Sequence, residues 1–135
     1  MSILVDTQVF LWAAGIEGRL SDSTREILED PEQPIFFSAA SAWEIAAKWA
    51  RGRLDLPASP GEVVKNVVAA GGLTQLSVSV RDALELAELP PHHADPFDRL
   101  LVAQARNNGL RLMTADPILE RYDVDVIALW LDDDE

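Results

Sequence analysis

The chain has 135 residues, of which 48% are hydrophobic, so it is long enough for one domain with a sizeable core. The absence of cysteine excludes disulfides and thiolate metal sites and fits a reducing cytoplasm. A net charge of −12 argues against a nucleic-acid coat protein, although it leaves room for a nuclease with local basic patches. There is no apolar run of the roughly 20 residues that span a membrane, and no signal peptide pattern. We therefore expect a cytoplasmic protein that does not enter the membrane.

Short apolar runs alternate with helix-like segments along the whole chain. In chain order, the patterns predict a strand over 3–5, helices over 9–14 and 21–29, a strand over 35–37, helices from Ser38 or Ser41 to 51 and over 62–70, a strand over 73–78, helices from Ser79 or Asp82 to 89 and over 96–108, a strand over 110–113, a helical turn over 117–121 and a strand over 124–130. Residues 1–131 are expected to form one domain. Residues 132–135 are expected to be an acidic, disordered tail.

Strands that alternate with helices are typical of parallel βαβ units. The expected fold class is therefore a three-layer α/β/α fold with a central parallel sheet of about five strands. Ligands of such sheets bind at the carboxyl ends of the strands. Residues that follow the strands are the first place to look for a functional site.

Four acidic residues lie where a predicted strand ends or a predicted helix begins. They are Asp6, Glu44, Asp98 and Asp116. The expected topology delivers all four carboxylates to the same edge of the sheet, where they would repel one another. A divalent cation relieves that repulsion, and ligands that are all oxygen suit Mg²⁺ or Mn²⁺. The pattern therefore indicates metal-dependent phosphate chemistry.

Each of these acids also has a purely structural interpretation. Asp6 is placed to cap the helix that follows it. Glu44 and Lys48 have the i,i+4 spacing of an exposed ion pair on a helix. Asp95 in Asp95-Pro96-Phe97-Asp98 is placed as an N-cap, which leaves Asp98 free for another role. The local sequence alone leaves both interpretations open.

Several neighbouring residues have supporting or structural roles. Thr114 is placed to hydrogen-bond an acidic neighbour. His92 and His93 lie in a proline-rich loop and are expected to be exposed and mobile rather than ligands. Three tryptophans are assigned to the core by default, although an exposed one would suit a partner: Trp12, Trp43 and Trp49.

Motifs for other phosphate and hydrolase chemistries are absent. The chain has no P-loop, no dinucleotide-binding glycine pattern and no G-x-S-x-G elbow. With no obvious histidine base, a metal-activated water is the economical nucleophile.

In combination, the segments resemble the PIN-domain family and, within it, the VapC-type toxins of bacterial toxin–antitoxin pairs. The matching segments are LVDTQVFLW at 4–12, SAWEIAAK at 41–48, HHADPFDRLLVAQA at 92–105 and LMTADP at 112–117. The resemblance covers essentially all of residues 3–130. It is the order and spacing of the segments that make it specific.

The resemblance implies a Mg²⁺- or Mn²⁺-dependent endoribonuclease that leaves 5′-phosphate and 3′-hydroxyl ends. Asp6, Glu44, Asp98 and Asp116 match the family's acidic positions and would be both catalytic residues and metal ligands. Asp95 and Thr114 are secondary candidates for the site. The candidates for contact with the RNA phosphates are Arg99, Lys48 and Arg51.

The resemblance also implies partners. The expected ones are an RNA substrate and a cognate antitoxin, whose tail would block the pocket with an Arg or Lys near Asp6 and Asp98. A homodimer remains open. One rival hypothesis is a receiver-like phosphorylation domain, although Thr7 follows Asp6 where a second acid is usual and no lysine occurs beyond Lys65. The other is a PIN-like scaffold that binds a partner without catalysis.

Overall fold

The computed structural model describes residues 2–131, so the predicted acidic tail at 132–135 lies outside the described residues. The elements are β1 (Ile3–Val5), α1 (Thr7–Ala13), α2 (Asp22–Glu29), β2 (Ile35–Ser38), α3 (Ala39–Ala50), α4 (Pro60–Gly71), β3 (Thr74–Leu76), α5 (Val80–Glu85), α6 (Pro96–Asn108), β4 (Arg111–Thr114), the 3₁₀ helix η1 (Pro117–Arg121), β5 (Val126–Ala128) and the 3₁₀ helix η2 (Leu129–Leu131). Within this described range, no helix is long and apolar enough to cross a membrane.

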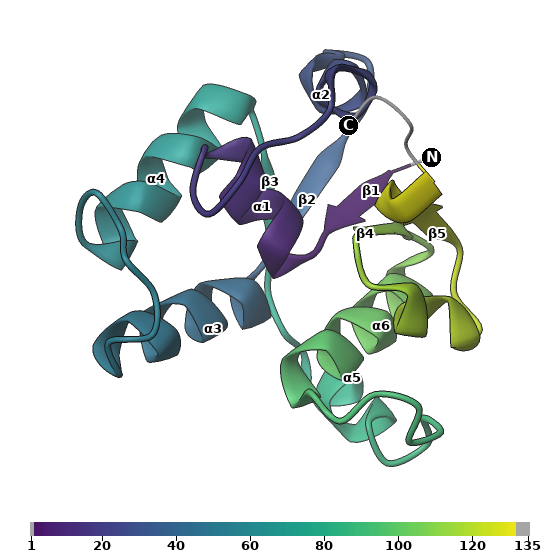
Figure 1. Cartoon of the computed structure of the whole chain (residues 1–135). Coiled ribbons are helices and arrows are strands. Elements are labelled where there is room, and N and C mark those ends of the chain that lie inside the picture. The colour runs from purple at the N-terminus through teal and green to yellow at the C-terminus, as the bar shows by residue number, and fades with distance from the viewer. Residues whose placement is uncertain (1, 132–135) are drawn as a thin grey trace.

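The five strands form one parallel sheet in the order β3-β2-β1-β4-β5 (Figure 1). The chain moves outward from β1 through β2 to β3, then crosses back to place β4 on the other side of β1. The reversal of direction therefore lies between β1 and β4, and ligands of open α/β sheets bind at such a point. The order differs from the 2-1-3-4-5 order of flavodoxin-like receiver domains, which the receiver hypothesis requires.

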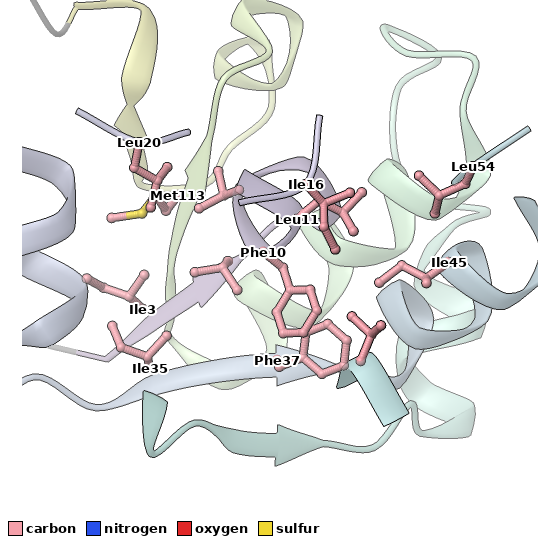
Figure 2. Packing of buried hydrophobic residues seen from close by; sticks show 13 residues of the cluster. Ile3, Phe10, Leu11, Ile16, Leu20, Ile35, Phe37, Ile45, Leu54 and Met113 are labelled. Carbon is pink, nitrogen blue, oxygen red and sulfur yellow. The ribbon is translucent and has the colours of Figure 1, made fainter. Parts of the chain in front are cut away.

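Helices cover both faces of the sheet, as predicted. On one face, side chains of β1 and β2 pack against α1, α3 and α4, and the rings of Phe10 and Phe37 stack with centroids 4.1 Å apart (Figure 2). On the other face, Leu4 and Leu112 pack against the buried side of α6. The predicted three-layer α/β/α fold with five parallel strands is confirmed.

Local capping explains where most helices begin and end. Ser21 and Ser38 accept hydrogen bonds from the first turns of α2 and α3, and Pro96 occupies the start of α6. Gly109 ends α6 with a φ of 63°, a left-handed conformation that glycine adopts without a steric penalty.

Some predictions about extent and burial were wrong. The helix expected up to residue 89 ends at Glu85, and only residues 126–128 of the expected strand over 124–130 are paired. Trp43 and Trp49 are 65% and 45% exposed, so two of the three tryptophans assigned to the core lie on the surface of α3.

Candidate active site

The four predicted acids line one open pocket of about 610 Å³. Asp6 directly follows β1, and Asp116 lies two residues beyond the end of β4. Glu44 lies in the second turn of α3, and Asp98 lies in the first turn of α6. The pocket therefore forms beside the reversal point of the sheet, from four segments that are far apart in sequence.

Asp6 caps α1, as its structural interpretation predicted, and it also lines the pocket. Its Oδ1 accepts a hydrogen bond from the Val9 backbone N–H at 2.8 Å. The pKa of Asp6 is raised to about 6, chiefly by burial and also by the charges of Glu44 and Asp116, while hydrogen bonds from Thr114 and Val9 oppose the rise. Because the pocket disfavours the charged form of this acid, a bound cation would be favoured here.

Glu44 is buried and is held from two sides. The hydroxyl of Thr7, in the first turn of α1, donates to Glu44 Oε1 at 2.7 Å. The Nζ of Lys48 donates to Oε2 at 2.6 Å, and this hydrogen bond raises the pKa of the Lys48 ammonium. The predicted i,i+4 pair therefore exists, but its acidic member faces the pocket rather than solvent.

Asp98 is partly buried beside three other acids. Burial raises its pKa to about 7, with further contributions from the negative charges of Asp95, Asp6 and Glu44, while His93 lowers it. Asp95 itself accepts from the Phe97 N–H at 2.8 Å, the capping bond predicted for it. It also lines the pocket.

Asp116 begins η1 and faces the same pocket. Its Oδ1 accepts from the Ile118 N–H at 3.0 Å. Its own N–H donates to Thr114 Oγ1 at 3.0 Å, so Thr114 contacts an acidic neighbour, as predicted. Thr114 thereby connects Asp116 to Asp6 across the ends of β4 and β1.

His93 is a site residue that the sequence analysis missed. Its side chain is 15% exposed, and its Nε2 lies 2.7 Å from Asp116 Oδ2 and 3.3 Å from Asp98 Oδ2. The buried Tyr122 accepts from the His93 backbone N–H at 2.9 Å. The expectation of an exposed, mobile histidine pair was therefore wrong for His93, because Tyr122 and Asp116 hold the loop from more than 20 residues away.

The prediction of basic residues at the pocket was partly wrong. Arg99 does not line the pocket, because its guanidinium donates to the backbone carbonyls of Leu86 and Leu89. Arg51 is exposed and also lies outside the pocket lining. Lys48 lines the pocket, and so does Arg53, which was not among the predicted residues. The cations that face the acids are therefore Lys48 and Arg53.

The donor set fits a hard divalent cation. The four acids offer carboxylate oxygens only, the ligand type that Mg²⁺ and Mn²⁺ prefer. Ligand atoms of His93, Asp98 and Asp116 lie within 4.8 Å of one another. Burial, with a further contribution from neighbouring acids, raises the pKa values of Asp6 and Asp98, and a bound cation would favour their ionised forms.

The family model described as "PIN domain" matches residues 3–125. A chain from the crystal structure of VapBC2 from Rickettsia felis bound to a DNA fragment from their promoter has a TM-score of 0.71 and 13% identity, and the match covers 95% of this chain and 98% of that one. A chain of FitAcB from Neisseria gonorrhoeae has a TM-score of 0.61 and 20% identity over 95% and 98% of the two chains. A chain of VapBC-1 from nontypeable Haemophilus influenzae has a TM-score of 0.60 and 13% identity over 96% and 99%. Comparison of the sequence with curated proteins found no match.

Proposed function

The chain belongs to the PIN domain family, and on that premise we propose that it is a Mg²⁺- or Mn²⁺-dependent endoribonuclease and the toxin of a toxin–antitoxin pair. We assign the activity to one cytoplasmic domain over residues 1–131. The reaction is hydrolysis of an RNA phosphodiester to 5′-phosphate and 3′-hydroxyl ends.

The observation that carries this proposal is the convergence of Asp6, Glu44, Asp98 and Asp116 in one pocket. A structural protein has no need to bring four carboxylates together at the cost of raised pKa values. The arrangement suits a site that pays this cost for function.

The residues of the pocket divide into three roles. Asp6, Glu44, Asp98 and Asp116 would hold the cation or cations. A bound Mg²⁺ or Mn²⁺ supplies an activated water and compensates charge on the phosphate oxygens. Lys48 and Arg53 line the same pocket and would attract and orient the RNA backbone, which an acidic protein otherwise repels. Thr7 fixes the carboxylate of Glu44 through its hydrogen bond to Oε1.

Cleavage of RNA by the purified protein tests the proposal. A mixture of end-labelled RNAs is incubated with Mg²⁺, with Mn²⁺ and with EDTA, and the product ends are identified. Cleavage with either metal, none with EDTA, and loss by at least 100-fold in Asp98→Asn would support the assignment. Asp123→Asn is a matched control, because Asp123 is exposed and does not line the pocket. If the protein bound a partner but cut no RNA under any of these conditions, the non-catalytic scaffold would be the better hypothesis.

A toxin requires an antitoxin, and solved structures of the same fold are complexes described as VapBC and FitAB. We propose that an Arg or Lys of the antitoxin enters the acidic pocket near Asp6 and Asp98, while its apolar residues lie along the helices near Trp12, Trp43 or Trp49. Apolar contacts would then supply most of the affinity and the cation the orientation. Co-purification with the product of the adjacent reading frame, at low and high salt, tests this. A complex that dissociates fully in moderate salt would contradict it, and light scattering of the chain alone would report on a homodimer.

A further inference from the structure

Both ring nitrogens of His93 have defined partners. The backbone N–H of Asp95 donates to His93 Nδ1 at 2.9 Å. A backbone amide is only a donor, so Nδ1 must present its lone pair and cannot carry a proton in this arrangement. The ring proton therefore resides on Nε2, which faces Asp116 Oδ2 at 2.7 Å and Asp98 Oδ2 at 3.3 Å. The loop conformation thus selects one tautomer.

We propose that His93 is a positioning residue that presents this Nε2–H to Asp116 and Asp98, and that it is not a ligand of the metal, an inference that rests on the proposed metal-dependent function. His93, Asp98 and Asp116 together have the composition of a metal site, in which His93 could be a ligand. The proposal assigns His93 to orienting the two carboxylates instead. The metal ligands are then carboxylate oxygens alone.

The surroundings of Nδ1 argue against ligation. A histidine that binds a metal through one nitrogen normally donates its other N–H to a carboxylate, carbonyl or water. In His93 the other nitrogen faces the N–H of Asp95, so a proton moved from Nε2 to Nδ1 would meet a donor. Turning the ring to escape that clash would break its hydrogen bonds to both Asp95 and Asp116.

As a donor, His93 complements the other supports of the pocket. Asp6 is held by Val9 and Thr114, and Glu44 is held by Thr7 and Lys48. His93 provides the equivalent support for Asp116, which follows β4, and its Nε2 also lies 3.3 Å from Asp98 Oδ2 on α6. A hydrogen bond to a carboxylate is stronger than one between neutral groups, so this N–H can hold the carboxylate of Asp116 beside that of Asp98.

The tautomer can be read directly on the wild-type protein. Long-range ¹H–¹⁵N correlation spectra of ¹⁵N-histidine-labelled protein distinguish a protonated ring nitrogen from an unprotonated one. The expected result is a protonated Nε2 and an unprotonated Nδ1 both in metal-free protein and with saturating Mg²⁺. Loss of the Nε2 proton on Mg²⁺ addition would overturn the proposal, because Nε2 would then be a ligand.

Two substitutions distinguish the role of Nε2 from the role of Nδ1. The amide of His93→Gln places a donor near the position of Nε2, whereas His93→Asn places its acceptor near Nδ1 and loses the distant donor. Mg²⁺ affinity, measured by calorimetry, should remain within about threefold of wild type in His93→Gln and fall by about 10–100-fold in His93→Asn and His93→Ala. His92→Gln is the matched control on the exposed neighbouring histidine. Equal loss in His93→Gln and His93→Ala would contradict a positioning role.

These measurements do not use RNA, so the two proposals can fail separately. A protein that shows the expected tautomer and Mg²⁺ binding but cuts no RNA would contradict the nuclease assignment only. A protein that cuts RNA with Mg²⁺ and loses the Nε2 proton would contradict the role of His93 only.

Discussion

Lys48 Nζ lies 2.6 Å from Glu44 Oε2, and the two side chains differ sharply in exposure, 51% for the lysine and 5% for the glutamate. The buried carboxylate is therefore partly neutralised by a cation that reaches in from the mouth of the pocket. In the proposed nuclease, that cation would compete with the metal for the same oxygen and would also attract the phosphates of the substrate. Lys48 should consequently affect metal binding and RNA binding in opposite directions.

Replacement of Lys48 by methionine tests this opposition. In metal-free protein the change should cost about 1–2 kcal/mol of unfolding free energy, because Glu44 loses a charged hydrogen bond. Mg²⁺ affinity should rise, because one oxygen and one negative charge are freed, while KM for RNA should rise several-fold. Calorimetry and steady-state cleavage measure the two effects. Unchanged Mg²⁺ affinity would mean that Glu44 Oε2 does not contribute to the metal site.

Thr7 should be needed for activity through its hydroxyl. Thr7→Val keeps the shape of the side chain but removes the hydrogen bond to Glu44 Oε1. The expected result is a loss of about tenfold in kcat with Mg²⁺, because Glu44 loses its orientation toward the pocket. Thr7→Ser restores the hydroxyl and should retain most of the activity. Equal loss in both variants would indicate that packing of the γ-methyl group, rather than the hydroxyl, is what matters.

The order of strands, helices and acidic residues along the chain was enough to predict the parallel sheet and the convergence of the four carboxylates in one pocket. Parallel strands place their carboxyl ends at one edge, so an acid after β1 and an acid after β4 must approach each other once the strands pair. Asp6 and Asp116 could therefore be placed from local patterns. The caps at Ser21, Asp95 and Gly109 were predictable for the same reason, since each depends on residues within one turn.

The residues that were missed depend on distant partners. His93 is ordered by Tyr122 and Asp116, which lie 29 and 23 residues further along the chain. Arg99 was expected to contact the RNA phosphates, yet its guanidinium donates to the backbone carbonyls of Leu86 and Leu89. No local pattern encodes these contacts. The proline-rich sequence at residues 90–93 instead favoured an exposed and mobile His93.

Gly18 should be required for the placement of Trp12. A Cβ at Gly18 would lie 2.8 Å from Trp12 Nε1, closer than two such atoms can approach. Gly18→Ala should therefore displace the indole and destabilise the protein by about 1–3 kcal/mol, as overpacking does elsewhere. Denaturant unfolding and the tryptophan emission maximum report the two effects. Gly61→Ala is a suitable control, because nothing lies within 4 Å of a Cβ at that position.

Asp98→Asn should stabilise the metal-free protein while it abolishes cleavage. The pKa of Asp98 is raised to about 7 by burial and by neighbouring acids, so its ionised form is disfavoured in the folded state. Removal of that charge at pH 8 in chelator should raise the unfolding free energy by about 1–3 kcal/mol. Mg²⁺ should raise the melting temperature of wild type more than that of the variant. Full ribonuclease activity in Asp98→Asn would remove Asp98 from the catalytic site.

The stability of the metal-free protein should fall as pH rises from about 4 to about 7. The carboxyl groups of Asp6 and Asp98 have pKa values of about 6 and about 7 in the folded protein, against an ordinary value of 3.8. In this window the folded state binds more protons than the unfolded state, so unfolding becomes easier as pH rises and the effect levels off above pH 7. The two acids together should account for a few kcal/mol.

Denaturant unfolding of chelator-dialysed protein at pH 5, 6, 7 and 8 measures this dependence. The slope should be smaller in Asp6→Asn, which removes one of the two groups without touching His93, and unchanged in Asp123→Asn. Saturating Mg²⁺ at pH 8 should recover much of the lost stability, because the cation favours the ionised carboxylates that the empty pocket disfavours. A stability that rises with pH across this range would show that Asp6 and Asp98 are not buried beside other acids as the structure places them.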